Sequence, residues 1–126
     1  MKREFKLYLS DIIRATDKIK CYTRNLNIKD FKKSDMAIDA TTRNLEIIGE
    51  AISQMQEEKK TEYSGVPWQE VKNFRNVVIH KYHSVDVDIL WDIIKTKLGP
   101  LKQQIQDILE KESNKDEEKN EDNNTN

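Results

Sequence analysis

The chain has 126 residues, of which 36% are charged and 36% are hydrophobic, with only three glycines and two prolines. This length gives one domain with a modest core, and the composition favours long amphipathic helices over a turn-rich β architecture. The formal net charge is -1, and without residues 111–126 it is 19 basic minus 17 acidic residues, or +2. A protein that binds RNA through a broad electrostatic surface usually carries a larger positive charge. The lone cysteine, Cys21, excludes an internal disulfide and is assigned to packing.

Apolar residues step by three and four along four stretches, which is the spacing of one buried helix face. The predicted helices span about residues 2–23, 34–58, 66–83 and 87–108. Ser34 or Asp35 is the expected cap of the second helix. Gly49 lies inside that helix, which predicts close approach of a neighbouring helix. Together these stretches predict an all-α bundle of four to five helices.

The segments between the helices carry turn and polar residues. Asn25, Asn27 and Asp30 predict a turn, followed by Phe31 as an anchor, and residues 57–65 predict a polar connection. Gly99 and Pro100 fall inside the fourth helix, where we expect a kink without an end, because the apolar spacing resumes in register.

The two ends of the chain carry charge rather than apolar surface. Residues 111–126 hold three basic against six acidic residues, which predicts a disordered acidic tail after a helical domain of residues 1–110. The charged N-terminus has no apolar run long enough for a signal peptide or a membrane span. We therefore expect a cytoplasmic protein that does not contact the membrane.

Residues 74–83 concentrate most of the reactive side chains, including both histidines. Arg75 supplies a permanent anion-binding fork, His80 a proton that moves near neutral pH, and Tyr82 a latent nucleophile. His83 is assigned to a helix end or the surface. The combination predicts a phosphate-handling site, although the same residue types at these spacings also occur as plain capping or packing groups.

Helical geometry separates the two main candidates. A turn of about 100° per residue places Asn76 and His80 on one face and points Arg75 away from His80. Metal-free cleavage of RNA needs a base, an acid and a cation, and one histidine cannot be base and acid at the same moment. A two-fold dimer would bring two copies of each group together, so a homodimer is expected. No residues have metal-ligand spacing, and no cofactor is predicted.

Several blocks of sequence resemble the HEPN ribonucleases, and in particular the HepT-type (DUF86) branch. Residues 75–82, RNVVIHKY, match the R-x4-H-x-Y form of the HEPN motif. The other matching blocks, in chain order, are YLSDI at 8–12, RNLEIIGEA at 43–51, VPW at 66–68, and VD at 85–86 followed by LW at 90–91. The resemblance covers about residues 5–109.

The resemblance implies more than the spacing does. In this family Arg75 and His80 would be the catalytic pair in a cleft shared by two protomers of a helical homodimer, acting on RNA without a metal. Asn76 would position the phosphate or the histidine. Glu46 and Glu50 would support the arginine or histidine, unless they form only a solvated helix face.

The resemblance also implies a partner and a form of control. HepT-type proteins are toxins of type VII toxin–antitoxin systems, whose antitoxin is a minimal, MntA-like nucleotidyltransferase. That partner would transfer AMP from ATP to Tyr82, placing an anion beside His80 that repels the RNA backbone. The alternative is a non-catalytic HEPN subunit that binds a nucleotide or serves as the scaffold of a nucleotidyltransferase complex.

Overall fold

The computed structural model describes residues 3–76 and 86–124, with side chains up to residue 119. Its elements are α1 (Phe5–Thr23), α2 (Ile28–Lys33), α3 (Asp35–Gln54), α4 (Glu57–Glu62), α5 (Trp68–Asn73), α7 (Val87–Asp92), the π-helix η1 (Ile93–Lys97) and α8 (Leu98–Asn124). The described residues contain no strand, so the all-α prediction is confirmed.

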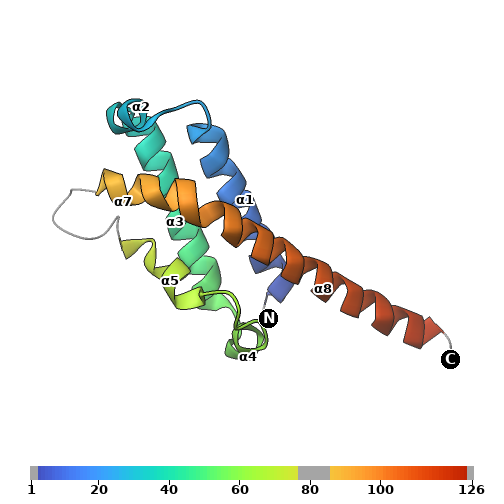
Figure 1. Cartoon of the computed structure of the whole chain (residues 1–126). Helices are drawn as coiled ribbons and strands as arrows, with labels where there is room; N and C mark the ends of the chain where they lie inside the picture. Colours follow the sequence, from blue (N-terminus) through green and yellow to red (C-terminus); the bar gives the residue numbers. More distant parts are fainter. Residues whose placement is uncertain (1–2, 77–85, 125–126) are drawn as a thin grey trace.

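Three helices make the frame of the bundle. Figure 1 shows α1 and α3 running antiparallel, while α7, η1 and α8 form one continuous helix that crosses them and extends beyond the bundle. The core between them is closed by fully buried aliphatic side chains, among them Leu9, Ile12, Leu45, Ile48 and Ile105. The stepping by three and four that predicted the first two long helices is therefore the stepping of their buried faces.

Six helices are present in the described residues when the continuous α7–η1–α8 helix is counted once, more than the four to five predicted. The additional helices are α2 and α4, which lie in the two segments expected to be connections. The Asn27 side chain accepts a hydrogen bond from the backbone nitrogen of Asp30 at 2.8 Å and so caps α2. Phe31 is completely buried, which confirms it as the anchor of this segment.

The predicted ends of the long helices need small corrections. The second predicted helix stops at Gln54 rather than near residue 58, and Met55 turns into the core instead. Ser34 caps α3 as predicted, its hydroxyl accepting from the backbone nitrogen of Ala37 at 3.1 Å. The third begins at Trp68, with Pro67 preceding the first turn.

The fourth predicted helix begins as expected but buries a different face at its start. The Asp86 side chain caps it by accepting from the backbone nitrogen of Ile89 at 3.2 Å. The stepping by three and four back from Leu98 predicts Ile94, Trp91 and Val87 as its buried positions. These three residues pack against the core only partly buried, whereas Leu90 and Ile93 are buried, and the next buried residue is Leu98. The five-residue step from Ile93 to Leu98 is the π-turn, in which the Leu98 backbone nitrogen donates to the Ile93 oxygen.

Pro100 gives a physical reason for this wide turn. A proline inside an α-helix cannot donate to the carbonyl four residues earlier, and its ring clashes with that carbonyl, here the carbonyl of Thr96. Thr96 lies within η1, so the clash is accommodated by a locally widened helix. Gly99 precedes the proline, where a side chain would disfavour the helical backbone. The predicted continuation of the helix through Gly99 and Pro100 is confirmed.

The disordered tail predicted for residues 111–126 is not shown. Instead α8 remains helical to Asn124, without a break at residue 110. The tail has no aliphatic or aromatic side chain, but Glu112 is buried and its polar contacts hold this part of α8 on the bundle. Composition alone missed this anchor because the contact is ionic rather than hydrophobic.

Candidate functional site

Of the three reactive side chains of the predicted motif, Arg75 is the one that lies within the described residues. It follows α5 and its stem crosses α3 at Gly49, where an added Cβ would lie 3.1 Å from the Arg75 Cδ and 3.7 Å from its Cγ. The same Cβ would lie 3.4 Å from the backbone oxygen of Lys72. The close approach predicted from Gly49 is therefore confirmed, and the approaching group is the candidate catalytic arginine.

The short helix α5 is held by three buried side chains, and this fixes where Arg75 starts. Trp68, Val71 and Phe74 are all buried. The Trp68 Nε1 donates to the backbone oxygens of Lys60 at 3.2 Å and Tyr63 at 3.1 Å, which ties the start of α5 to α4. A six-residue helix has little stability of its own, so these tertiary contacts position it.

The remaining motif residues are only partly accounted for. Asn76 is exposed directly after Arg75. The predictions for His80, Tyr82 and His83 lie outside the described residues. The described residues therefore contain one member of the predicted pair, a half-buried arginine whose stem packs against Gly49 just after α5.

Glu46 and Glu50 lie on α3 to either side of Gly49. The Glu46 carboxylate is 3.5 Å from an Arg43 nitrogen and the side chain keeps 37% of its surface exposed, while Glu50 is exposed. Among the described residues, neither carboxylate is hydrogen-bonded to Arg75. Their role in supporting the site stays a prediction.

Within residues 3–76 and 86–124, no three histidine, cysteine, aspartate or glutamate residues gather as a metal site would require. None of the helices in the same part of the chain combines the length and apolar character that crossing a bilayer demands.

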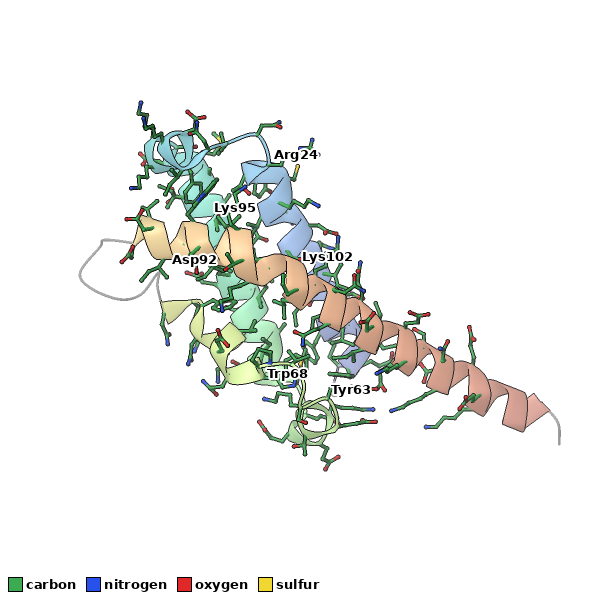
Figure 2. All side chains as sticks on the ribbon, viewed as in Figure 1. Arg24, Tyr63, Trp68, Asp92, Lys95 and Lys102 are labelled. Carbon is green, nitrogen blue, oxygen red and sulfur yellow. The ribbon has the colours of Figure 1, made fainter. Side chains whose placement is uncertain are left out.

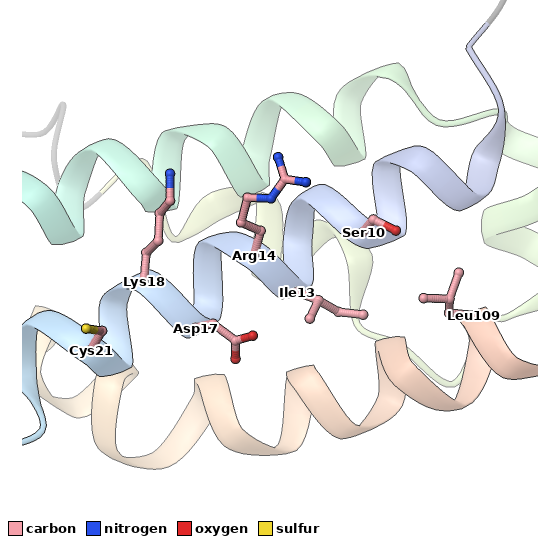
Figure 3. Close-up of a pocket in the computed structure, with 7 residues that line it drawn as sticks. All are labelled: Ser10, Ile13, Arg14, Asp17, Lys18, Cys21 and Leu109. Carbon is pink, nitrogen blue, oxygen red and sulfur yellow. The ribbon is translucent and has the colours of Figure 1, made fainter.

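A hollow lies along α1, and its lining includes no residue of α3 or α5. It runs from Ser10 to Cys21 and is bounded on one side by Leu109 of α8 (Figure 3). Figure 3 shows Arg14 and Lys18 projecting from α1 on one side and Asp17 on the side of α8. Cys21 is exposed here, so the assignment of this residue to packing is wrong.

A group of charged and polar side chains that meet around the buried Glu112 is a feature that the sequence does not reveal. Lys59, Tyr63, Glu112 and Lys115 form what we call the ionic cluster, where α4 meets α8. The Glu112 carboxylate accepts from the Lys59 Nζ at 2.6 Å and from the Tyr63 hydroxyl at 2.6 Å, and it lies 3.0 Å from the Lys115 Nζ. Burial alone would raise the pKa of Glu112, but these hydrogen bonds outweigh burial and lower the pKa to about 2.

The other groups of the ionic cluster respond to the same contacts. Hydrogen bonds to Glu62 and Glu112 raise the pKa of Lys115 above its ordinary value. Burial and the Glu112 carboxylate raise the pKa of Tyr63, which therefore stays a neutral hydrogen-bond donor. The cluster holds α4 and α8 together, and its charged groups are paired with one another.

The chain is similar to proteins named as ribonucleases. The family described as Ribonuclease HepT-like matches residues 12–108. A protein of Thermococcus cleftensis named "Probable ribonuclease HepT" is 38% identical over 102 residues, which cover 81% of this chain and 93% of that protein. "Putative RNase TTE0752" of Caldanaerobacter subterraneus is 33% identical over 105 residues, covering 83% and 94% of the two chains.

A longer relative is "Gamma-glutamylcyclotransferase and putative RNase MJ0434" of Methanocaldococcus jannaschii. It is 36% identical over 110 residues, which are 87% of this chain. The matched region spans only 50% of the length of that relative. No solved structure matches the chain significantly.

Proposed function

Because the chain belongs to the HepT-like ribonuclease family, we propose that it is an RNA endonuclease whose site is built from Arg75 and His80. The observation that carries the proposal is the placement of Arg75, whose stem is fixed against Gly49 while the family match extends across the whole region. A guanidinium anchored in this way suits a phosphate, because its planar fork pairs with two phosphate oxygens at once.

The proposed reaction is attack of a ribose 2′-hydroxyl on the adjacent phosphorus, with departure of the 5′-oxygen of the next nucleotide. One His80 takes the 2′-hydroxyl proton, and a second His80 protonates the leaving oxygen. Arg75 stabilises the charge that builds on the phosphate oxygens. Two copies of His80 require a second protomer, so we propose a homodimer whose site is shared across the two-fold axis.

These protein groups supply the base, the acid and the cation, so the proposed reaction needs no metal. Asn76 is exposed next to Arg75 and would position the phosphate or the imidazole. Glu46 and Glu50 flank Gly49 and would orient the arginine once the dimer forms. The expected location is the cytoplasm, where the RNA substrate is found.

We further propose that the chain is the toxin of a type VII toxin–antitoxin pair. The partner is a minimal nucleotidyltransferase that transfers AMP from ATP to the Tyr82 hydroxyl, forming a phosphodiester and releasing pyrophosphate. The new anion would stand two residues from His80 and repel the RNA backbone from the cleft. This control rests on the match of residues 75–82 to the R-x4-H-x-Y motif.

The catalytic proposal is tested with purified protein and a labelled RNA that the parent cleaves. Arg75→Ala and His80→Ala should each lower cleavage at least about 100-fold, because each removes a group that acts in the transition state. Arg3→Ala removes an arginine that pairs with Asp11 on the surface and should leave cleavage unchanged. If both site variants cleave as fast as the parent, the assignment is wrong.

The control proposal has its own measurement. Incubation with the partner and ATP should add an AMP-sized mass to the parent chain and stop cleavage. Tyr82→Phe should keep cleavage, gain no mass and resist the partner. The parent could instead bind RNA or nucleotide tightly but cleave no RNA, whatever the molar ratio of partner to chain. That result would support the non-catalytic scaffold.

A further inference from the structure

A second surface of the chain gathers positive charge along α1 and along the part of the long α7–η1–α8 helix that packs near the C-terminal end of α1. Two hollows lie along α1: the one in Figure 3, and a second one of about 370 Å³ between the C-terminal end of α1 and residues 94–102 of the long helix. Their cationic lining, which we call the basic seam, consists of Arg14, Lys18, Lys20, Arg24, Lys95 and Lys102. Asp17 lines both hollows and is the one carboxylate among their lining residues.

The excess of charge is local. Over the whole chain 22 basic residues face 23 acidic ones, whereas the seam has six cations and one carboxylate. Asp17 is already paired with the Lys102 Nζ at 2.5 Å. In the part of the chain that the structure describes, Lys20, Arg24 and Lys95 take part in no salt bridge. A weakly charged protein thus presents a strongly charged strip.

The π-turn contributes one cation of the seam. The wide turn η1 carries Lys95, and the exposed Gly99 leaves open space beyond it, since an added Cβ there would meet no atom within 4 Å. The Lys95 Nζ lies 4.6 Å from the centroid of the Trp91 ring, which itself packs against Phe31 at 5.1 Å. This cation–π contact favours a position of the exposed Lys95 ammonium over the Trp91 ring.

Figure 2 labels Arg24 at the end of α1 and Lys95 and Lys102 along the long helix, and the three side chains line the same hollow. The opposite side of that helix, carrying Lys97 and Leu101, faces α5. The basic seam therefore lies across the long helix from α5, the helix that Arg75 follows. A ligand in the seam would be held apart from the proposed catalytic residues.

Two observations decide what kind of ligand fits. A second copy of this chain, packed two-fold on this face, would bring the cations of one seam against those of the other and is disfavoured. An extended polyanion is favoured, because the cations are spread over several helical turns of α1 and onto the neighbouring part of the long helix rather than focused on one point. The family's substrate class supplies such a polyanion.

We propose that the basic seam binds the phosphate backbone of single-stranded RNA that flanks the cleavage point. The choice of RNA rests on the proposed function, whereas the seam itself rests on the side chains above. Contacts of this kind carry no base specificity, and they raise affinity in a salt-dependent way. The seam would hold a long substrate while the residues beyond α5 act on one phosphate.

The test uses the full chain and a fluorescent single-stranded RNA made of 2′-O-methyl nucleotides, which lacks the attacking hydroxyl and stays intact. The seam variant combines Lys20→Gln, Arg24→Gln and Lys95→Gln. By anisotropy it should bind about tenfold or more weakly than the parent, and the slope of log K against log salt should fall by about 2, since three phosphate contacts are lost.

A matched variant removes the same charge elsewhere: Lys33→Gln, Lys111→Gln and Lys119→Gln. These lysines are exposed and line neither hollow. The matched variant should bind as the parent does, and Lys95→Arg, which keeps the charge over Trp91, should as well. Circular dichroism should show the same helix content in all variants, because the altered side chains are exposed.

The outcomes separate this inference from the proposed function. An equal loss in the seam and matched variants, or no loss in either, overturns the seam. A parent that binds no RNA overturns the seam as well. The cations would then bind an acidic protein partner or stabilise the C-terminal end of α1 through the helix dipole. Weaker binding by the seam variant alone supports the seam even if the parent cleaves nothing, in which case only the ribonuclease proposal fails.

Discussion

The ionic cluster and the basic seam both gather charged side chains between distant parts of the chain, yet they treat charge in opposite ways. In the ionic cluster one buried carboxylate, Glu112, is shared by Lys59, Tyr63 and Lys115 at 2.6–3.0 Å. In the basic seam six cations share one carboxylate, Asp17. Charges that stabilise a fold neutralise one another, whereas unmatched charges on a surface need a ligand or solvent.

The difference predicts which surface is needed for folding and which for binding. Removing a partner from the ionic cluster leaves buried groups without hydrogen bonds and should destabilise the chain. Removing a cation from the seam exposes nothing buried and should change only the affinity for an anion. Stability and binding measurements on the same variants can therefore test the comparison.

The largest effect is expected from Glu112→Ala. It leaves the Tyr63 hydroxyl and the Lys59 ammonium without their shared acceptor, and we expect a loss of about 3 kcal/mol in the free energy of unfolding. Urea unfolding followed by circular dichroism measures the loss. Glu118→Ala, at an exposed site on the same helix, is the control and should cost less than about 0.5 kcal/mol. Similar values for the two variants would show that the ionic cluster does not hold α8.

A somewhat smaller effect is expected from acid. The pKa of Glu112 is about 2 in the folded chain, below the value of about 4.3 for a free glutamate. Its ionised form therefore stabilises the fold above about pH 4.3, and this contribution is lost as the pH falls from there to about 2, by on the order of 2 kcal/mol.

The acid effect is measured by comparing the parent with Glu112→Gln in urea at several pH values. The parent should be more stable at neutral pH, and the difference between the two should shrink toward zero as the pH approaches about 2. A difference that stays constant across this range would mean that packing, and not the charge, gives Glu112 its role.

Some of these features could be predicted from the sequence and others could not. The buried faces of α1 and α3 were predicted because one face of a regular helix repeats every three to four residues. The same rule failed at the start of the fourth helix, because the π-turn at Ile93–Lys97 shifts the buried positions by one residue. The short helices α2 and α4 were missed because contacts far along the chain stabilise them, not their own periodicity.

The candidate site shows the same division. A glycine inside a helix indicated that something approaches Gly49, but only the fold shows that the approaching group is the stem of Arg75. The ionic cluster and the basic seam each join residues about 50 to 80 positions apart in the sequence. No local sequence pattern can therefore predict them. Chemistry carried by one segment can be found from sequence, whereas sites assembled from two helices require their packing.

The smallest expected effect on stability, and the one that tests the site most directly, is that of Gly49→Ala. The new Cβ would lie 3.1 Å from the Arg75 Cδ, so the arginine stem must shift by a few tenths of an ångström. Alanine gains up to about 1 kcal/mol in helix propensity, which offsets the strain and keeps the change in unfolding free energy below about 1 kcal/mol. Cleavage should fall about tenfold, since a displaced guanidinium no longer meets the phosphate in register.

Gly65→Ala is the matched control, because a Cβ at Gly65 meets no atom within 4 Å. It should leave both the cleavage rate and the unfolding free energy close to those of the parent. Gly49→Ala could cleave as well as the parent while Arg75→Ala does not. The contact between the Arg75 stem and Gly49 would then not determine where the guanidinium acts. A loss of cleavage without a loss of stability would instead tie the activity to this one contact, since nothing else in the fold would have changed.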